Sequence, residues 1–303
     1  MNRILIAAFS VIPSLAALSA CSGTEAKAPQ TKAQQAARPA LWKVVDPDTT
    51  VYLFGTIHML PKGLTWTTPT MAKAMSESQG LVLEVALDKD PAKLGAIMTR
   101  LGVTAGLPPL LDRVPPAKRA ALQKVIDESK VPIGYLNGLE TWAAALVLST
   151  VSLSKLNLSH EDGVETQLTQ TFSAVGKPVS GLETAEQQLG YFDGLPETAQ
   201  RKFLASIADD TQNAQKEFAA MIAAWKAGDV RRIAITFDDE MKMSKDLTDV
   251  LLRRRNANWA GWIAERMNTP GTVFVAVGAG HLAGKGSVEE LVSQKGYKVV
   301  RVQ

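Results

Sequence analysis

Two glycine–histidine motifs follow apolar, strand-like segments near opposite ends of the chain. The first is GTIH, residues 55–58, directly after residues 51–54, and the second is GAGH, residues 278–281, directly after residues 273–277. The chain has only three histidines, so two of them stand three residues after a glycine at the end of a predicted strand. Glycine permits a sharp turn or a close backbone approach at such a place. The motif glycines predicted to serve this purpose are Gly55, Gly278 and Gly280.

Acidic residues also lie at the ends of predicted strands. Glu84 interrupts the apolar run LVLEVAL, where an ionised carboxylate is costly unless it is paired or coordinated. Glu183 closes a shorter strand-like segment. In open α/β sheets, ligands bind at the carboxyl ends of the parallel strands. We therefore expect His58, Glu84 and His281 to form a catalytic site, with Glu183 nearby.

Two imidazoles and a carboxylate support more than one chemistry. As metal ligands, His58, Glu84 and His281 would suit Mn, Co or Zn and leave positions open for an activated water. Without a metal, one histidine would act as a general base while a glutamate orients it or protonates a leaving group. Histidines beside apolar walls would also serve a haem-binding protein. The residues alone leave these alternatives open.

Each of these residues also has a purely structural interpretation. Glu84 could face water on an edge strand, Glu183 could cap the following helix, and Glu165 could be an ordinary acid in the first turn of a helix. A single histidine after a strand is often a satisfied structural residue. A solvent-facing position is the structural expectation for His160 and for Arg253, Arg254 and Arg255. Packing in the core or at an interface is the structural expectation for Trp225, Trp259 and Trp262.

The amino terminus is typical of a bacterial secretion signal. Residues 1–20 carry a basic start and a short apolar stretch and end in small residues before the only cysteine, Cys21. We expect a lipoprotein signal peptide with Cys21 as the lipid-bearing residue; an ordinary signal peptide followed by a chance cysteine is the alternative. Residues 21–40, poor in large apolar side chains, are predicted to be a flexible tether, and residues 41–303 to form the folded domain.

Composition narrows the classes of partner. The 303 residues include 33 basic and 30 acidic residues, a formal net charge of +3. This even balance, without a long basic run, excludes a typical nucleic-acid binder. A single cysteine excludes an intramolecular disulfide and a thiolate zinc cluster.

Hydrophobic periodicity predicts strands at both ends of the chain and a large helical middle. The first strands form a hairpin, followed by a helix and a third strand in a βαβ unit with a parallel pair. The fold class is therefore α/β (α+β), a central mixed sheet with a helical insertion. The predicted strands are 41–45, 50–55, 80–85, 176–183, 272–277 and 298–302, and a long helix is predicted at 241–267.

The ordered set of motifs resembles the TraB/GumN family, which includes bacterial GumN-like proteins and is related to the animal Tiki proteins. The matching segments are LFGTIH at 53–58, LE at 83–84, GLET at 181–184, RN at 255–256 and VGAGHL at 277–282. The resemblance spans residues 41–303. It implies a fold shared with erythromycin-esterase-like and haem-binding ChaN-like proteins.

The same resemblance implies an activity and a location. Tiki members are regarded as metal-dependent proteases, which implies a hydrolase acting on a peptide or protein substrate through His58, Glu84 and His281. Arg255 and Asn256 match the family's Arg-Asn position and, with Glu183, are implied to bind substrate or support the site. With a lipid at Cys21, the protein is expected in the bacterial cell envelope, anchored to the outer membrane and facing the periplasm. An envelope-assembly role without catalysis is the remaining alternative.

Overall fold

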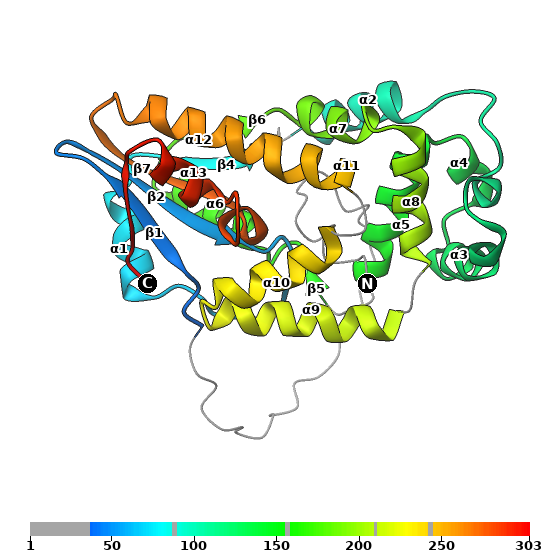
Figure 1. Ribbon diagram of the computed structural model, residues 1–303, viewed down its shortest axis with the longest axis horizontal. Helices are drawn as coiled ribbons and strands as arrows, with labels where there is room; N and C mark the ends of the chain where they lie inside the picture. Colours follow the sequence, from blue (N-terminus) through cyan, green and yellow to red (C-terminus); the bar gives the residue numbers. More distant parts are fainter. Residues whose placement is uncertain (1–36, 87–89, 155–157, 209–210, 242–244) are drawn as a thin grey trace, which may run out of the picture.

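The computed structural model describes residues 37–86, 90–154, 158–208, 211–241 and 245–303. Its centre is a six-stranded mixed sheet of order β6-β4-β7-β2-β1-β8 (Figure 1). The neighbours β6, β4, β7 and β2 are parallel, whereas β1 is antiparallel to both β2 and β8. The strands are β1 Leu41–Val45, β2 Thr49–Thr56, β4 Leu81–Val85, β6 Val179–Glu183, β7 Gly271–Gly278 and β8 Lys298–Arg301.

This arrangement confirms the mixed sheet built from both ends of the chain. The β1–β2 hairpin is present, and its turn is closed by the Asp46 carboxylate, which accepts from the Thr49 backbone N–H at 2.7 Å. One detail differs from the expectation. β2 and β4 are parallel but not neighbours, because β7 from the other end of the chain lies between them.

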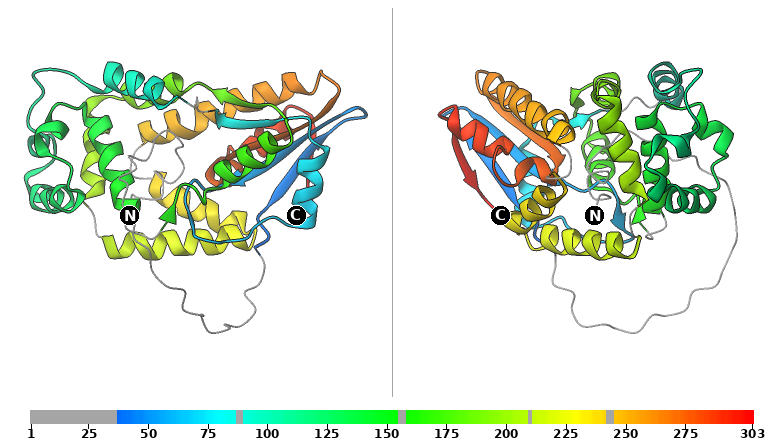
Figure 2. Two further views of the ribbon diagram at one scale, coloured as in Figure 1. Left: turned by 180° about the vertical axis from the view of Figure 1, so that it is seen from behind. Right: turned by 45° about the vertical axis from the view of Figure 1, so that its right-hand side comes forward.

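Helices cover both faces of the sheet (Figure 2). On one face, α1 and α6 pack with α9 and α10 around Phe54 and Phe274. On the other, α12 and α13 pack around Val51 and Val275. Alternating strand residues therefore feed two cores, as expected for a sheet buried on both sides. The helices are α1 Pro69–Glu77, α6 Val164–Ala174, α9 Thr211–Lys226, α10 Val230–Met241, α12 Arg254–Arg266 and α13 Val288–Gln294.

A second group of helices forms the unit on the right of Figure 1. Its core gathers around Trp142, Leu146 and Phe192 and is separate from the two sheet-facing cores. The buried Arg113 ties its loops together by donating to the carbonyls of Pro108, Asn137 and Leu139. The helices are α2 Pro91–Gly102, α3 Pro116–Ser129, α4 Ile133–Asn137, α5 Thr141–Ser154, α7 Ala185–Asp193 and α8 Glu197–Ile207, with the 3₁₀ turn η2 Leu110–Arg113.

The remaining elements connect these parts. The short strands β3 Leu60–Pro61 and β5 Leu158–Ser159 pair as a two-stranded ribbon. α11 Lys245–Thr248 leads through the π-helical turn η3 Asp249–Arg253 into α12. The helix predicted at 241–267 is therefore helical from Lys245 to Arg266 with a change of helix type, while Met241 ends α10 and residues 242–244 lie outside the described residues. The 3₁₀ turn η4 Ala279–Leu282 follows β7.

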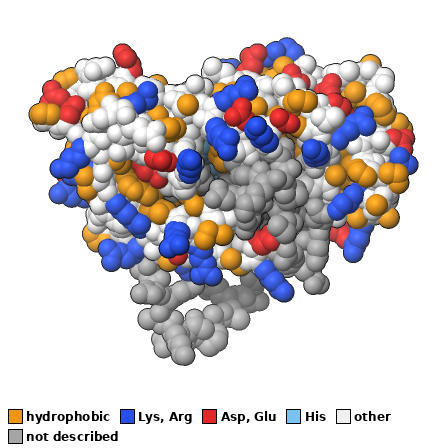
Figure 3. Space-filling view, in the orientation of Figure 1, with side chains coloured by type: hydrophobic (Ala, Val, Ile, Leu, Met, Phe, Trp, Pro, Cys, Tyr) orange, Lys and Arg blue, Asp and Glu red, His pale blue; other side chains and the backbone are white. Residues whose placement is uncertain are grey.

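The described amino terminus belongs to the folded unit. The Arg38 backbone N–H donates to the Lys226 carbonyl at 2.7 Å, and Ala37 and Ala40 are buried. Ordered packing thus begins before Leu41. Figure 3 shows basic and acidic side chains interspersed over one face, consistent with the even charge balance. The predicted signal peptide and Cys21 lie outside the described residues.

Candidate functional site

The four parallel strands end at one edge of the sheet, and both glycine–histidine motifs lie there. β2 and β7 pair in register, with Thr56 opposite Gly278, so the two histidines follow neighbouring strand ends. Gly55 explains how closely they approach. A Cβ at Gly55 would lie 3.1 Å from the Ala279 Cα, so glycine allows η4 to pack directly onto β2.

His58 is held by a residue from another part of the chain. Its Nδ1 lies 2.5 Å from the Glu165 Oε1, and the His58 side chain is 3% exposed. Gly163 makes this possible, because a Cβ there would come within 2.1 Å of the His58 carbonyl oxygen. The Val164 backbone N–H donates to the Ile57 carbonyl at 3.1 Å. α6 therefore begins against the motif, and its first turn delivers Glu165 to the imidazole.

The charge state of Glu165 follows from this pairing. Burial alone would raise the pKa of Glu165, but the charge of His58, in contact at 2.5 Å, is the largest opposing effect and the pKa is lowered. Glu165 is thus an ionised carboxylate beside the imidazole. The interpretation of Glu165 as an ordinary first-turn acid is incomplete: it is in the first turn of α6, and it also contacts His58.

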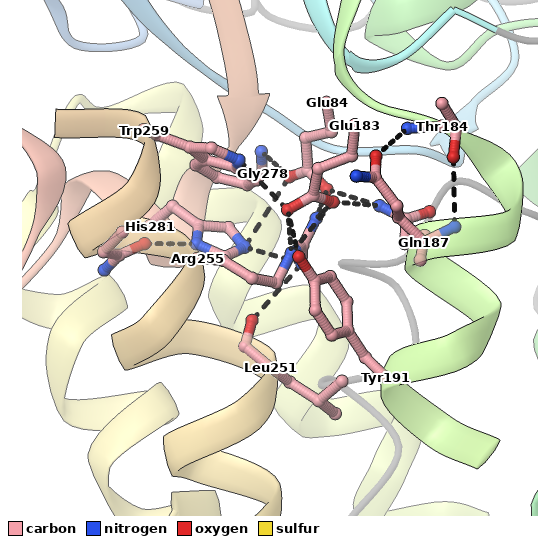
Figure 4. Close-up of polar contacts among 12 residues, drawn as sticks. Glu84, Glu183, Thr184, Gln187, Tyr191, Leu251, Arg255, Trp259, Gly278 and His281 are labelled. Atoms are coloured by element: carbon pink, nitrogen blue, oxygen red, sulfur yellow. Dashed lines mark hydrogen bonds and ion pairs between the residues drawn. The ribbon is translucent and has the colours of Figure 1, made fainter. Parts of the chain in front are cut away.

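Arg255 forms the centre of the second half of the site (Figure 4). Its Nη2 donates to Glu84 Oε2 at 2.7 Å and to Glu183 Oε2 at 2.8 Å, and its Nε donates to Glu183 Oε1 at 2.9 Å. All three side chains are buried. Desolvation would lower the pKa of Arg255, but the two carboxylates outweigh it and raise the pKa. Arg255 is therefore a buried cation, unlike its exposed neighbours Arg253 and Arg254.

Glu84 is not on an edge strand, so the interpretation of this residue as water-facing is wrong. It lies on β4, between β6 and β7, and its Oε1 accepts the Gly278 backbone N–H at 2.7 Å. Gln188 from α7 donates its Nε2 to Glu84 Oε2 at 3.2 Å. The carboxylate inside the apolar run is thus satisfied by a guanidinium, a backbone N–H and an amide.

Four side chains contact the Glu183 carboxylate, among them Gln188, whose Nε2 lies 3.5 Å from Oε2. Besides Arg255, the Trp259 indole N–H donates to its Oε1 at 3.0 Å, and the Tyr191 hydroxyl lies 3.5 Å from the same oxygen. Burial raises the pKa of Glu183, Arg255 opposes this rise, and the nearby charge of Glu84 adds to it. The helix-capping role belongs to the next residue, Thr184, which forms a capping box with Gln187.

His281 has amide and guanidinium partners. Its Nδ1 lies 2.5 Å from Asn256 Oδ1, and Asn256 Nδ2 donates to the Gly286 carbonyl at 2.8 Å. That orientation makes Oδ1 an acceptor, which assigns the proton to Nδ1. The His281 Nε2 then faces Arg255 Nη1 at 3.3 Å and Glu84 Oε1 at 3.6 Å.

The environment keeps His281 neutral. Burial, the positive charge of Arg255 and the charge of His58 together hold its pKa well below the usual range. The Trp259 ring packs against the imidazole with centroids 4.4 Å apart. The two motif histidines follow strand ends that are paired in register, Thr56 opposite Gly278.

The structure thus brings most predicted site residues together. Residues joined by direct contacts are Glu84, Glu183, Arg255, Asn256, Gly278 and His281. His58 lies outside this set of contacts and follows the neighbouring strand β2, and Gly280 is buried within η4. Sequence reasoning missed Glu165, Gln188 and Tyr191, and placed Trp259 only in the core. The one signal for Glu165 was its position two residues after Gly163.

Each of the three predicted metal ligands has a protein partner: Glu165 for His58, Arg255 for Glu84 and Asn256 for His281. Among the residues that the structure describes, no group of three or more His, Cys, Asp or Glu side chains is placed to hold a metal ion. At this site the reason is Arg255. Both Glu84 oxygens already accept hydrogen bonds, and a divalent cation would share the carboxylate with a guanidinium 2.7 Å away. In this arrangement Glu84 is committed to Arg255 and Gly278, so a metal ion here would depend on His58 and His281 as ligands.

The fold and the site together define a class of α/β protein. In this class two histidines follow neighbouring parallel strands, beside a buried Arg–Glu cluster. The TraB/PrgY/gumN family model matches residues 40–301, and the chain belongs to this family. It is 27% identical over 245 residues to "Uncharacterized protein YbaP" of Escherichia coli (strain K12), covering 80% of this chain and 87% of that protein. The YbaP protein of Shigella flexneri matches with the same identity and coverage. No solved structure matches.

Proposed function

We propose that this protein is a hydrolase in which His58 acts as general base and Glu165 orients it. The observation that carries the proposal is the 2.5 Å contact between His58 Nδ1 and the ionised Glu165 carboxylate. A carboxylate at one imidazole nitrogen fixes the ring and stabilises the imidazolium that forms when the other nitrogen takes a proton. His58 would remove a proton from water at Nε2 as the water oxygen attacks a substrate carbonyl. The protonated His58 would then give this proton to the leaving amine or alcohol as the C–N or C–O bond breaks.

The second histidine has a different part in this proposal. His281 is neutral and has its Nδ1 proton directed at Asn256, so it is a poor base. Its contribution is to fix the edge of the site together with Arg255 and Glu84. Because the cluster joins β4, β6, β7 and α12, it holds the strand ends rigid around the base. The proposed substrate is a peptide or an ester with a carbonyl accessible at this edge.

A substrate panel tests this function. The full chain, kept in detergent, is incubated with chromogenic esters and a fluorogenic peptide library. We expect hydrolysis of at least one member, lost on His58→Asn and retained on His160→Asn. His160 is the matched control because the hydrogen bonds it shows are made by its backbone carbonyl, to Gly163 and Thr166. Equal rates in wild type and His58→Asn would remove His58 from the mechanism.

A metal-dependent peptidase is the second candidate function. One observation favours it: each motif histidine has its Nδ1 directed at an outer acceptor, Glu165 or Asn256, as metal-binding histidines commonly do. A bound metal would supply Lewis-acid chemistry and an activated water. Metal analysis after loading with Mn, Co or Zn tests it. One equivalent that disappears in His58→Ala and His281→Ala would support this function over the first. The haem-binding and envelope-assembly alternatives have no described contact that favours them.

The proposed location is based on the amino-terminal sequence. Since an apolar stretch ends in small residues before the only cysteine, we infer a lipid anchor at Cys21 and a site facing the periplasm from the outer membrane. In the described residues, no helix is both long and apolar enough to cross a membrane. Metabolic labelling with a palmitate analogue tests the anchor. Label in the wild type that is absent in Cys21→Ser supports it, and unlabelled wild type contradicts it.

A further inference from the structure

The helix that carries Arg255 changes type directly before it. η3, Asp249–Arg253, is π-helical and lies between α11 and α12. The Arg254 backbone N–H donates to the Asp249 carbonyl, a bond spanning five residues. π-helical turns are rare and are often found at functional sites. Here the turn ends one residue before α12, whose second residue is Arg255.

The π turn changes which face of the helix looks inward. Before it, Leu247 packs against the core of the helical unit, and Leu251 within the turn belongs to the same core. After it, Trp259 and Ile263 pack on the sheet. One extra residue in a helical turn rotates the following face by about 100°. The turn therefore lets one continuous segment satisfy two cores while directing Arg255 towards Glu84 and Glu183.

Two side-chain contacts join the turn to the first residues of α12. The Arg254 Nε lies 3.0 Å from Asp249 Oδ2, although residues five apart do not share a face of an α-helix. The Arg255 Nη1 also donates to the Leu251 carbonyl at 3.3 Å, so the side chain itself is bonded to the turn. The Asp249–Arg254 contact, which spans five residues, favours the π turn over an α-helical one.

We propose that the π turn Asp249–Arg253, supported by the Asp249–Arg254 ion pair, positions Arg255 between the two site carboxylates. Asp249 and Arg254 are then positioning residues that act through Arg255. The inference rests on the proposed function only in giving Arg255 a catalytic site to support. The test measures the position of the Arg255 side chain and needs no substrate. The positioning role of the π turn and the proposed hydrolase function can therefore fail independently.

The first experiment removes one residue from the turn in the full chain. Deletion of Val250 should convert the segment to continuous α-helix, whereas Val250→Ala removes most of the side chain and keeps the residue count. The readouts are the Arg255 Nε–H and Trp259 indole N–H resonances. We expect the Arg255 resonance to be lost or moved to its solvent-exposed position only in the deletion, with the Trp259 bond to Glu183 kept. An unchanged Arg255 resonance in a folded deletion variant would overturn the proposal.

The second experiment does not depend on the deletion folding. Asp249→Asn and Arg254→Gln are compared with Asp112→Asn, which breaks an exposed ion pair elsewhere, the 3.1 Å contact between Asp112 and Arg119. Backbone exchange at Arg254 should speed up by about two- to fivefold in the first two, the range that an exposed pair can supply. The Arg255 Nε–H should exchange faster as well. If both rates match those of Asp112→Asn, the ion pair does not support the turn.

Discussion

His58 and His281 occupy matching places after the neighbouring parallel strands β2 and β7, yet opposite kinds of partner hold them. His58 faces the carboxylate of Glu165 at 2.5 Å, whereas His281 lies between the amide of Asn256 and the guanidinium of Arg255. A carboxylate stabilises an imidazolium and a guanidinium opposes one. Two equivalent motifs therefore provide one residue suited to carry a proton and one kept neutral.

Replacing Glu165 by Gln should reduce hydrolysis strongly while the protein stays folded. The amide keeps the size of the side chain but no longer stabilises the imidazolium, so kcat/KM should fall by about 10²- to 10⁴-fold. Glu161→Gln, a change in the nearby loop, is the control and should have little effect. A loss confined to KM would show that Glu165 binds substrate instead of supporting the base.

Replacing Arg255 by Met should destabilise the fold. Glu84 and Glu183 would remain buried without their cation, which costs about 3–5 kcal/mol in the free energy of unfolding. Urea denaturation measures the loss. Arg254→Met, at an exposed neighbour, should stay within about 0.5 kcal/mol of wild type. Adding Glu84→Gln and Glu183→Gln to Arg255→Met should restore part of the stability; no recovery would show that packing, not charge, sets the cost.

Because the pKa of His281 is lowered in the folded state, this residue should make the protein less stable as pH falls. The folded state resists protonation of this imidazole because of burial and Arg255. Its contribution to stability is complete above the unfolded pKa of about 6.5 and is lost as pH falls below that value. His281→Asn should therefore flatten the slope of unfolding free energy between about pH 6.5 and 5. An NMR titration in which His281 protonates near its ordinary pKa would contradict this.

Glu289 is expected to change stability with pH in the opposite direction to His281. Burial raises its pKa from 4.5 to about 7, and its Oε2 is a buried atom with no hydrogen-bond partner in the described structure. The protonated form is favoured on folding, so its stabilising contribution is complete below pH 4.5 and is lost as pH rises through about 7. Glu289→Gln should raise Tm at pH 8 relative to wild type and change it little at pH 4. Equal shifts at both pH values would contradict a raised pKa.

The residues at the carboxyl ends of the strands could be predicted from the sequence. The contacts that they make with distant segments could not. The motifs at His58 and His281 were visible because glycine and histidine follow apolar runs, and Glu84 was visible because an acid inside such a run needs a partner. Glu165 was not, since its contact with His58 joins separate segments through α6. The place of β7 between β2 and β4 was equally hidden, because strand order depends on long-range packing.

The π turn before Arg255 was missed for a different physical reason. Periodicity assumes 3.6 residues per turn throughout, so one extra residue inside 241–267 leaves the pattern helical. The triplet Arg253 to Arg255 then looks like one solvated stretch. In the structure, Arg255 is 0% exposed while Arg254 is 67% exposed. Periodicity does not distinguish the third arginine from the first two. The family resemblance singled out Arg255, and the structure shows why it differs: it donates to Glu84 and Glu183.

The most direct measurement is hydrolysis by metal-stripped protein, using any substrate that the panel identifies. The rate is recorded in excess chelator for wild type and His58→Asn, and again after adding Mn, Co or Zn. If His58 with Glu165 is the base, the wild type keeps its kcat/KM in chelator and His58→Asn loses it. Activity that returns only with added metal, or that survives in His58→Asn, would contradict the proposed mechanism.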